Sequence, residues 1–185
     1  MQLYIATTNK HKVSEISAIL STYSIDLLHK SLEIVEPDYD SLDKIAKEKA
    51  RQAFEKIKKP VIVEDTGVFF EAYNDFPGML AKRVFLGIGF DGLIALIKRV
   101  QNKRCHFKTV ICYYDGKEFK SFSGTLSGTL LENVVSLEKD RLPYEKIFVP
   151  DGYKDALADI DILEKNKISH RSKAAHALGK WLAGK

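Results

Sequence analysis

Residues 3–12 read Leu-Tyr-Ile-Ala-Thr-Thr-Asn-Lys-His-Lys, an apolar run that passes directly into a polar loop. A helical spacing of apolar residues begins at once afterwards, at Val13, Ile16, Ile19, Leu20 and Tyr23. We therefore predict a strand, a loop and a helix N-terminus in series. The first backbone N–H groups of a helix have no partner within it, and the helix dipole favours an anion beside them. Because the loop adds two hydroxyls, an amide and two lysines, the junction is suited to binding phosphate.

The same loop argues against one common class of phosphate-binding protein. The loop of Walker-type ATPases spaces two glycines before a Lys-Ser or Lys-Thr pair, and its backbone wraps the phosphates. No glycine lies between Met1 and Lys12, so we do not expect a Walker-type ATPase. Taken alone, the segment is also compatible with an ordinary strand-to-helix turn whose lysines are solvated.

The composition is that of a globular protein with a core of its own. The chain has 185 residues, of which 45% are hydrophobic and 29% charged. A chain of this length most often forms one domain, so we expect a single domain over residues 1–185. The net charge of +4 comes from 29 basic against 25 acidic residues. This mild excess suits a small anionic ligand, and we expect no nucleic acid partner.

Cysteine usage and hydropathy indicate the compartment. Cys105 and Cys112 lie close together in sequence with no second pair, which argues against a disulfide scaffold or a zinc site. We interpret both as core thiols in a reducing compartment. The first residues lead directly into a strand, and no run reaches the roughly 18 apolar residues that a membrane helix needs. We therefore expect no signal peptide, no membrane partner and a cytoplasmic protein.

Strand and helix patterns alternate in the first third of the chain, and the middle becomes rich in strands. The expected strands lie at residues 2–6, 25–29, 61–63, 105–114, 119–126 and 129–131, and the expected helices at about 11–23, 41–58 and 90–101. Asp115-Gly116 marks a hairpin turn, Phe76-Pro77-Gly78 a loop, and Ser169 the N-cap of a C-terminal helix. We expect an α/β fold: a mixed, partly antiparallel and elongated sheet flanked by helices, with two lobes and a central cleft.

Two adjacent carboxylates follow a buried-looking strand in residues 61–67, Val-Ile-Val-Glu-Asp-Thr-Gly. Ligands of open α/β sheets gather at the carboxyl ends of strands, where Glu64 and Asp65 would stand. Carboxylate oxygens beside bound phosphates are the ligands that Mg²⁺ prefers. Glu33 or Glu36, in the loop before the long helix, would add a further carboxylate. The segment therefore predicts a magnesium site, with a solvated acidic turn as the alternative.

A third charged segment, residues 164–171, reads Glu-Lys-Asn-Lys-Ile-Ser-His-Arg at the start of the last helix. Cationic side chains at a helix N-terminus oppose the helix dipole, so their placement calls for an anion nearby. Phosphate is the obvious candidate for that anion. A charged helix face in solvent is the usual alternative for such a run.

Four segments resemble, in order and spacing, the motifs of the inosine triphosphate pyrophosphatase family. Residues 6–12 are similar to its Thr-x-Asn-x-x-Lys loop, and residues 64–67 to its Asp/Glu-Asp-Ser/Thr-Gly turn. Residues 76–78 match its Phe-Pro-Gly loop, and residues 164–171 its highly specific Glu-Lys-Asn-x-x-Ser-His-Arg signature. The resemblance, which extends along nearly the whole chain, implies Mg²⁺-dependent hydrolysis of non-canonical purine nucleoside triphosphates. ITP, dITP and XTP would be converted to the monophosphate and pyrophosphate, which clears them from the nucleotide pool.

The resemblance also implies roles for individual residues. Asp65 would bind Mg²⁺ and serve as the proton acceptor, and Glu33 matches the second acidic metal ligand of the family. We therefore expect Asp65 to hold the metal with Glu33 or Glu64. The residues expected to contact the nucleoside triphosphate are Thr7, Thr8, Asn9, Lys10, His11, Lys12, Lys44, Thr66, Tyr144, Glu145, Lys165, His170 and Arg171. Those from Thr7 to Lys12 would cradle the triphosphate, and those near the C-terminus would contact the base and a phosphate. Because family members are commonly homodimers, we also expect a homodimer.

One segment departs from the family pattern. Where the family reads Phe-Gly-Tyr/Trp-Asp-Pro-x-Phe, residues 142–148 read Leu-Pro-Tyr-Glu-Lys-Ile-Phe. Tyr144 keeps the aromatic position, and Glu145 keeps a carboxylate that is one methylene longer. Leu142, however, removes an aromatic face for the purine, and Pro143 removes a backbone N–H. Two further hypotheses therefore stand: a nucleoside triphosphate pyrophosphatase with shifted base specificity, and a non-catalytic protein that binds a nucleotide or RNA.

Overall fold

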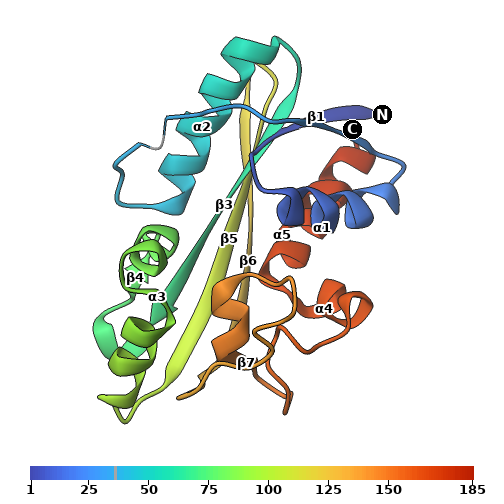
Figure 1. The fold of residues 1–185 in the computed structure, drawn as a ribbon. Coiled ribbons are helices and arrows are strands. Elements are labelled where there is room, and N and C mark those ends of the chain that lie inside the picture. The colour runs from blue at the N-terminus through green and yellow to red at the C-terminus, as the bar shows by residue number, and fades with distance from the viewer. Residues whose placement is uncertain (36) are drawn as a thin grey trace. The chain divides into compact units, whose positions relative to one another are not determined.

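The computed structural model describes residues 1–35 and 37–185 of the chain (Figure 1). With η marking a 3₁₀ helix, the elements in chain order are β1 (Gln2–Ala6), α1 (Lys10–Ser21), β2 (Asp26–Lys30), α2 (Leu42–Ile57), β3 (Val61–Phe70), η1 (Glu71–Tyr73), β4 (Phe76–Gly78), α3 (Ala81–Lys98), β5 (Arg104–Tyr114), β6 (Phe119–Leu130), η2 (Pro143–Ile147), β7 (Phe148–Pro150), α4 (Ile162–Ile168) and α5 (His170–Ala183). None of the described helices is both long and apolar enough to cross a membrane.

The strands form a mixed sheet in the order β2-β1-β3-β5-β6-β7, with β4 paired to β3. β1 is parallel to β2 and to β3, whereas β4 is antiparallel to β3 and β7 is antiparallel to β6. The register places Leu3 beside Leu27 and Ile5 beside Ile62. Helices flank the sheet, as Figure 1 shows, so the predicted α/β class with a mixed, partly antiparallel sheet is confirmed.

The chain divides into two compact units. Unit 1 comprises residues 1–66, 109–124 and 169–185, and unit 2 comprises residues 67–108 and 125–168. The long strands β3, β5 and β6 contribute residues to both units. The expected central cleft and the expected single domain stay predictions.

The apolar core of unit 1 lies where the alternation of β1 and the helical spacing of α1 predict it. β1 buries Leu3 and Ile5, and the apolar stripe of α1 buries Ile16, Ile19 and Leu20. α5 packs against α1 and adds its own small apolar side chains to the same cluster (Figure 1). This packing brings the first turn of α5 to the helix that follows the polar loop.

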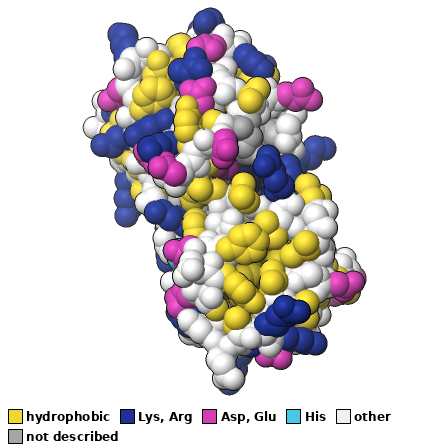
Figure 2. Space-filling model, turned by 90° about the vertical axis from the view of Figure 1, so that its left-hand side faces the viewer, with side chains coloured by type: hydrophobic (Ala, Val, Ile, Leu, Met, Phe, Trp, Pro, Cys, Tyr) yellow, Lys and Arg dark blue, Asp and Glu magenta, His cyan; other side chains and the backbone are white. Residues whose placement is uncertain are grey.

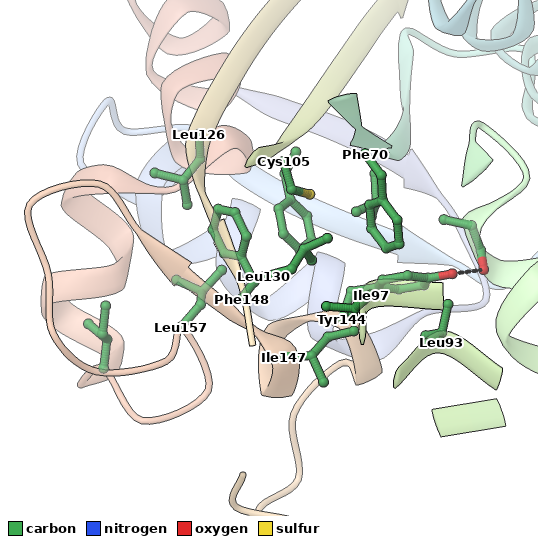
Figure 3. Close-up of a cluster of buried hydrophobic side chains, with 14 residues drawn as sticks. Phe70, Leu93, Ile97, Cys105, Leu126, Leu130, Tyr144, Ile147, Phe148 and Leu157 are labelled. Atoms are coloured by element: carbon green, nitrogen blue, oxygen red, sulfur yellow. Dashed lines mark hydrogen bonds between the residues drawn. The ribbon is translucent and has the colours of Figure 1, made fainter. Parts of the chain in front are cut away.

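Unit 2 has a separate apolar core, drawn in Figure 3. Its side chains come from several strands, from α3 and from the η2 segment, and include Phe70, Leu93, Ile97, Leu126, Leu130, Ile147, Phe148 and Leu157. Cys105 belongs to this core, and Cys112 is buried in unit 1, as expected for core thiols. Burial raises the pKa of the Cys112 thiol to about 11, which keeps it protonated and unreactive at neutral pH.

Several boundaries predicted from the sequence are wrong. β3 continues to Phe70 instead of ending at Val63, and β6 is continuous instead of broken. The loop predicted at residues 76–78 is the short strand β4. α3 begins at Ala81 and not near residue 90. The sequence prediction began too late because Gly89, with a φ of 59°, interrupts both the helical backbone and the apolar pattern. Polar residues end an apolar pattern in a sequence, but they do not end a strand whose polar side chains find partners.

Candidate active site

The two adjacent carboxylates of β3 point to opposite faces of the strand, because successive side chains of a strand alternate. Glu64 forms ion pairs with Lys12 from α1 and Arg171 from α5. Asp65 forms an ion pair with Lys49 from α2. The two carboxylates, which sequence reasoning treated as one acidic turn, therefore belong to two separate ionic contacts within unit 1.

Glu64 is the centre of a buried ionic network. Its fully buried side chain forms an ion pair with Lys12 Nζ. Arg171 Nε lies 3.1 Å from Oε1 of Glu64 and forms the second ion pair. The hydroxyls of Thr66 and Thr109 donate to the same carboxylate oxygen. Burial alone would raise the pKa of Glu64, but the charges of Lys12 and Arg171 outweigh burial and hold that pKa well below its ordinary value. Glu64 is therefore ionised at neutral pH and committed to the protein's own cations.

Arg171 is held by a second carboxylate. The residue is 1% exposed, and its Nη1 lies 2.5 Å from Oε2 of Glu15, a buried residue of α1. Glu15 and Glu64 thus contact different nitrogens of one guanidinium. Sequence reasoning expected an external anion to justify the cationic start of α5, whereas at Arg171 the anions come from the protein itself. His170, beside it, is also 1% exposed.

Asp65 stands in a different environment from Glu64. Lys49 Nζ lies 3.2 Å from Asp65 Oδ1, and the two side chains are 14% and 13% exposed. Burial raises the pKa of Asp65, and the charge of Lys49 offsets only part of that effect. A carboxylate whose charged form is destabilised gains from an approaching cation and is a better proton acceptor than an ordinary aspartate.

The donor chemistry at Asp65 fits a magnesium ligand. Mg²⁺ bound at phosphates uses hard oxygen ligands, often only one or two carboxylates beside the phosphates themselves. Asp65 offers a partly accessible carboxylate whose negative charge is poorly compensated. Glu64 suits the ion less well, because its carboxylate is fully buried between two cations. Among the described residues, no group of three or more His, Cys, Asp or Glu side chains is arranged to hold a metal.

The polar loop after β1 is ordered by its own side chains. Asn9 is the N-cap of α1, and its Oδ1 accepts the N–H groups of His11 at 3.0 Å and Lys12 at 3.4 Å. The N–H of Asn9 donates to Thr7 Oγ1 at 3.1 Å. Some amides that we expected to await phosphate are therefore already bonded within the loop. Lys10 is exposed at the first position of the helix, where its charge adds to the helix dipole.

Two predicted residues lie apart from this cluster. Glu33 is exposed, and its backbone carbonyl accepts a hydrogen bond from Lys56 Nζ at 2.6 Å. Lys44 has a side chain 60% exposed and pairs with Asp40 at 2.8 Å. Glu36, the other acidic residue considered for the metal, lies outside the described residues. The roles of Glu33 and Lys44 stay predictions.

In unit 2 the structure places Tyr144, Glu145 and Lys165 inside the protein. The ring of Tyr144 lies in the apolar core, and its hydroxyl donates to the carbonyl of Ala81 at 2.8 Å, as Figure 3 shows. Glu145 Oε1 lies 2.7 Å from Lys165 Nζ, and both side chains are 1% exposed. The contacts that anchor the segment departing from the family pattern therefore include the Tyr144 hydrogen bond and a buried ion pair.

Three residues of the site in unit 1 escaped the sequence reasoning: Glu15, Lys49 and Thr109. Glu15 had a weak signal, since it lies three residues after Lys12 and so shares its helix face. Lys49 lies next to the buried stripe of α2, but nothing distinguishes it from the other lysines of that helix. Thr109 is an ordinary strand residue in sequence, and only the pairing of its strand brings its hydroxyl to Glu64.

Comparisons with known proteins agree on one family. The sequence profile of the Ham1 family matches residues 3–181. A dITP/XTP pyrophosphatase from Hyperthermus butylicus is 38% identical over 181 residues, which covers 97% of this chain and 94% of that protein. A dITP/XTP pyrophosphatase from Methanopyrus kandleri is 36% identical, with 98% of this chain and 96% of that protein covered.

Solved structures match the fold over its whole length. A Ham1 protein from Coxiella burnetii superposes with a TM-score of 0.86 at 21% identity, with 100% of each chain covered. The Ham1 protein of Staphylococcus aureus gives a TM-score of 0.82 at 23% identity, covering 100% of this chain and 99% of that one. At these identities the structural likeness speaks for the fold alone.

Proposed function

The chain belongs to the Ham1 family, and from this membership we propose that it hydrolyses the non-canonical purine nucleoside triphosphates ITP, dITP and XTP. The products are the monophosphate and pyrophosphate, so the protein is a hydrolase of phosphoanhydride bonds. Full-length relatives that carry the name dITP/XTP pyrophosphatase support this substrate class. The observation in this chain that carries the proposal is the half-buried carboxylate of Asp65, held by Lys49 in the unit that also carries the phosphate-type loop.

We make three further inferences, which concern the domain organisation, the compartment and the oligomeric state. We infer that residues 1–185 act as a single catalytic domain in the cytoplasm, where the nucleoside triphosphate pool lies. We also infer a homodimer. The segment of β4 and α3 exposes large apolar side chains that a second copy would cover: Phe76, Leu80, Leu86 and Ile88. Figure 2 shows hydrophobic side chains gathered over the face that carries α3 and β4.

Phosphate binding is the first task of the site. Phosphoanhydride hydrolysis depends on neutralising the triphosphate and on holding a water in line with the leaving group. We assign the triphosphate to residues Thr7 to Lys12, with the exposed Lys10 as a mobile charge at the start of α1. Lys12, tied to Glu64, supplies a fixed positive charge at the same helix turn. Together with the helix dipole, the two lysines stabilise the departing pyrophosphate.

Proton transfer is assigned to Asp65. Its carboxylate accepts a proton from the attacking water, and burial favours this step because it raises the pKa of the group. Lys49 orients the carboxylate through Oδ1. When bound, Mg²⁺ would neutralise phosphate charge and polarise the attacked phosphoryl group, with Asp65 as the ligand that fits best and Glu33 as the second proposed ligand. Glu64 remains the third proposed ligand, although its present role is to hold cations.

Base recognition is assigned to the residues near the C-terminus and to η2. His170 and Arg171 begin α5, while Lys165 is fixed by Glu145. Thr66, which donates to Glu64 on the same face of β3, is assigned a contact with the substrate. Because the ring of Tyr144 packs in the apolar core, a base could stack only on a face of the ring that this packing does not cover. This observation favours the second candidate function, a pyrophosphatase of the same mechanism with shifted base specificity.

The test is pyrophosphate release from ITP, dITP, XTP, ATP, GTP, CTP and dUTP by the wild type and by Asp65→Asn, with Mg²⁺ and with EDTA. We expect Mg²⁺-dependent release confined to ITP, dITP and XTP. The Asp65→Asn variant should lose at least about 100-fold in kcat, the range of a general base, with an unchanged melting temperature.

The matched control is Asp159→Asn, which makes the same change in unit 2 at a carboxylate paired with Lys139. It should keep wild-type turnover. Pyrophosphate release from nucleoside triphosphates with other bases would be consistent with the same mechanism and would establish the shifted base specificity. Binding of a triphosphate without release of pyrophosphate would contradict the proposed enzymatic activity. It would support the hypothesis of a non-catalytic protein that binds a nucleotide or RNA.

A further inference from the structure

Glu15 is a buried carboxylate to which the proposed mechanism gives no task. It lies in the second turn of α1 and is 7% exposed. Its Oε2 is 2.5 Å from Nη1 of Arg171, a residue of another helix that is itself 1% exposed. Burying a charge pair is expensive compared with burying apolar side chains of the same volume. A carboxylate at this position therefore calls for a reason beyond packing.

The geometry supplies that reason. Arg171 donates through Nε to Glu64 and through Nη1 to Glu15, so two carboxylates grip two different nitrogens of a planar group. One contact would leave the guanidinium free to rotate about it, whereas two contacts set both its plane and its direction. Removing Glu15 therefore removes the contact that holds Nη1 and keeps the contact of Nε with Glu64.

Glu15 also links two parts of the proposed site. It lies three residues after Lys12, and both residues pair across to β3 or α5 from the same helix. The N-terminus of that helix is the polar loop to which we assign the triphosphate, and α5 carries His170 and Arg171. A single rigid helix therefore couples the phosphate loop to the orientation of Arg171.

We propose that Glu15 is a positioning residue that presets the orientation of Arg171 for binding the nucleoside triphosphate. The proposal rests on the proposed function, in which Arg171 contacts substrate. Because such a contact is made in the bound substrate as well as in the transition state, its loss raises KM and leaves kcat nearly unchanged. Glu15 acts through Arg171, so the effect of changing Glu15 depends on the presence of that guanidinium.

A double-mutant cycle tests this dependence. The proteins are the wild type, Glu15→Gln, Arg171→Lys and the double variant, with Asp159→Asn as a carboxylate-to-amide control outside the site. We expect Glu15→Gln to raise KM for XTP about tenfold with kcat within about threefold of wild type. In the Arg171→Lys background the same change should alter KM less than about twofold, since the group that Glu15 positions is gone. Glu15→Asp, which keeps the charge, should restore part of the loss.

Independent effects of the two substitutions on KM would overturn the proposal, because a Glu15 that does not act through Arg171 changes KM equally in both backgrounds. Melting temperatures of all variants separate that outcome from loss of folding. The same proteins are titrated calorimetrically with XTP in EDTA, so the coupling is also read from Kd without turnover. An active wild type with independent effects contradicts only this inference. An inactive wild type contradicts the proposed function, and the calorimetric cycle still decides the role of Glu15.

Discussion

The two units of this protein bury charge in different ways. In unit 1, Glu64 joins Lys12 and Arg171, and Arg171 also joins Glu15, so four charges form one connected network. In unit 2, Glu145 and Lys165 form a buried ion pair with each side chain 1% exposed. Removing one member of a buried pair leaves an uncompensated charge, whereas replacing both members by apolar groups is often neutral. The comparison therefore predicts that the pair can be exchanged for apolar side chains and the network cannot.

The largest effect is expected at the centre of the network. Glu64→Leu leaves Lys12 and Arg171 without their shared carboxylate and should lower the free energy of unfolding by about 4 kcal/mol. Adding Arg171→Met should not restore stability, because Glu15 then loses its ion pair with Arg171 and Lys12 still lacks Glu64. Urea unfolding curves of the single and double variants measure both values. If the free energy of unfolding of the double variant returned to within about 1 kcal/mol of wild type, Glu64 and Arg171 would behave as an isolated pair and not as part of a network.

A smaller and reversible effect is expected in unit 2. Lys165→Met leaves the buried carboxylate of Glu145 uncompensated and should cost about 3 kcal/mol of unfolding free energy. In the double variant Lys165→Met with Glu145→Leu, both charges of the pair are removed together, so stability should return to within about 1 kcal/mol of wild type. The same urea experiment decides the matter. A double variant as unstable as the single one would mean that the pair is embedded in further polar contacts.

The smallest effect is expected at a surface pair of unit 2, which provides the baseline for both buried cases. Arg104 contacts both carboxylate oxygens of Asp151, at 2.6 and 2.8 Å, and lowers the pKa of Asp151 from its ordinary value of 3.8. A lowered folded-state pKa adds stability above the ordinary value and loses it as the pH falls through the folded value. Asp151→Asn should therefore cost about 0.5 kcal/mol at pH 7 and less at pH 2, which lies below the ordinary pKa of the carboxyl group. Thermal unfolding at the two pH values, with raised salt as a second comparison, checks this difference.

Local signals located the ends of several elements correctly. Ser169 caps α5 as predicted, with its side chain accepting the N–H of Ser172, because a hydroxyl before a helical pattern satisfies an otherwise unpaired amide. The strand β1 has the predicted bounds, since its apolar run passes abruptly into polar residues. The extent of β3 could not be predicted in this way. Its carboxylates look like a turn in sequence and lie within a strand in the structure, where cations from three helices compensate them.

The candidate site was predictable as a set of motifs but not as a set of contacts. The loop from Thr7 to Lys12, the acidic Asp65 and the cationic start of α5 could each be named from residue types and spacing. That Glu64 and Asp65 face opposite ways follows from the strand that contains them, which the sequence pattern had ended too early. That Lys49, rather than Lys44, reaches the carboxylate of Asp65 depends on how α2 lies on the sheet.

Local patterns in the chain were thus enough to predict the α/β class, the family and the kind of chemistry, because periodicity, capping and motif spacing depend on neighbours in the sequence. The partners of the buried charges were decided only by the tertiary structure. Glu15 and Arg171 are more than 150 residues apart and meet because α1 packs on α5. A charge buried by such packing is compensated by whichever opposite charge the fold places beside it, so residue spacing along the chain does not predict the pair.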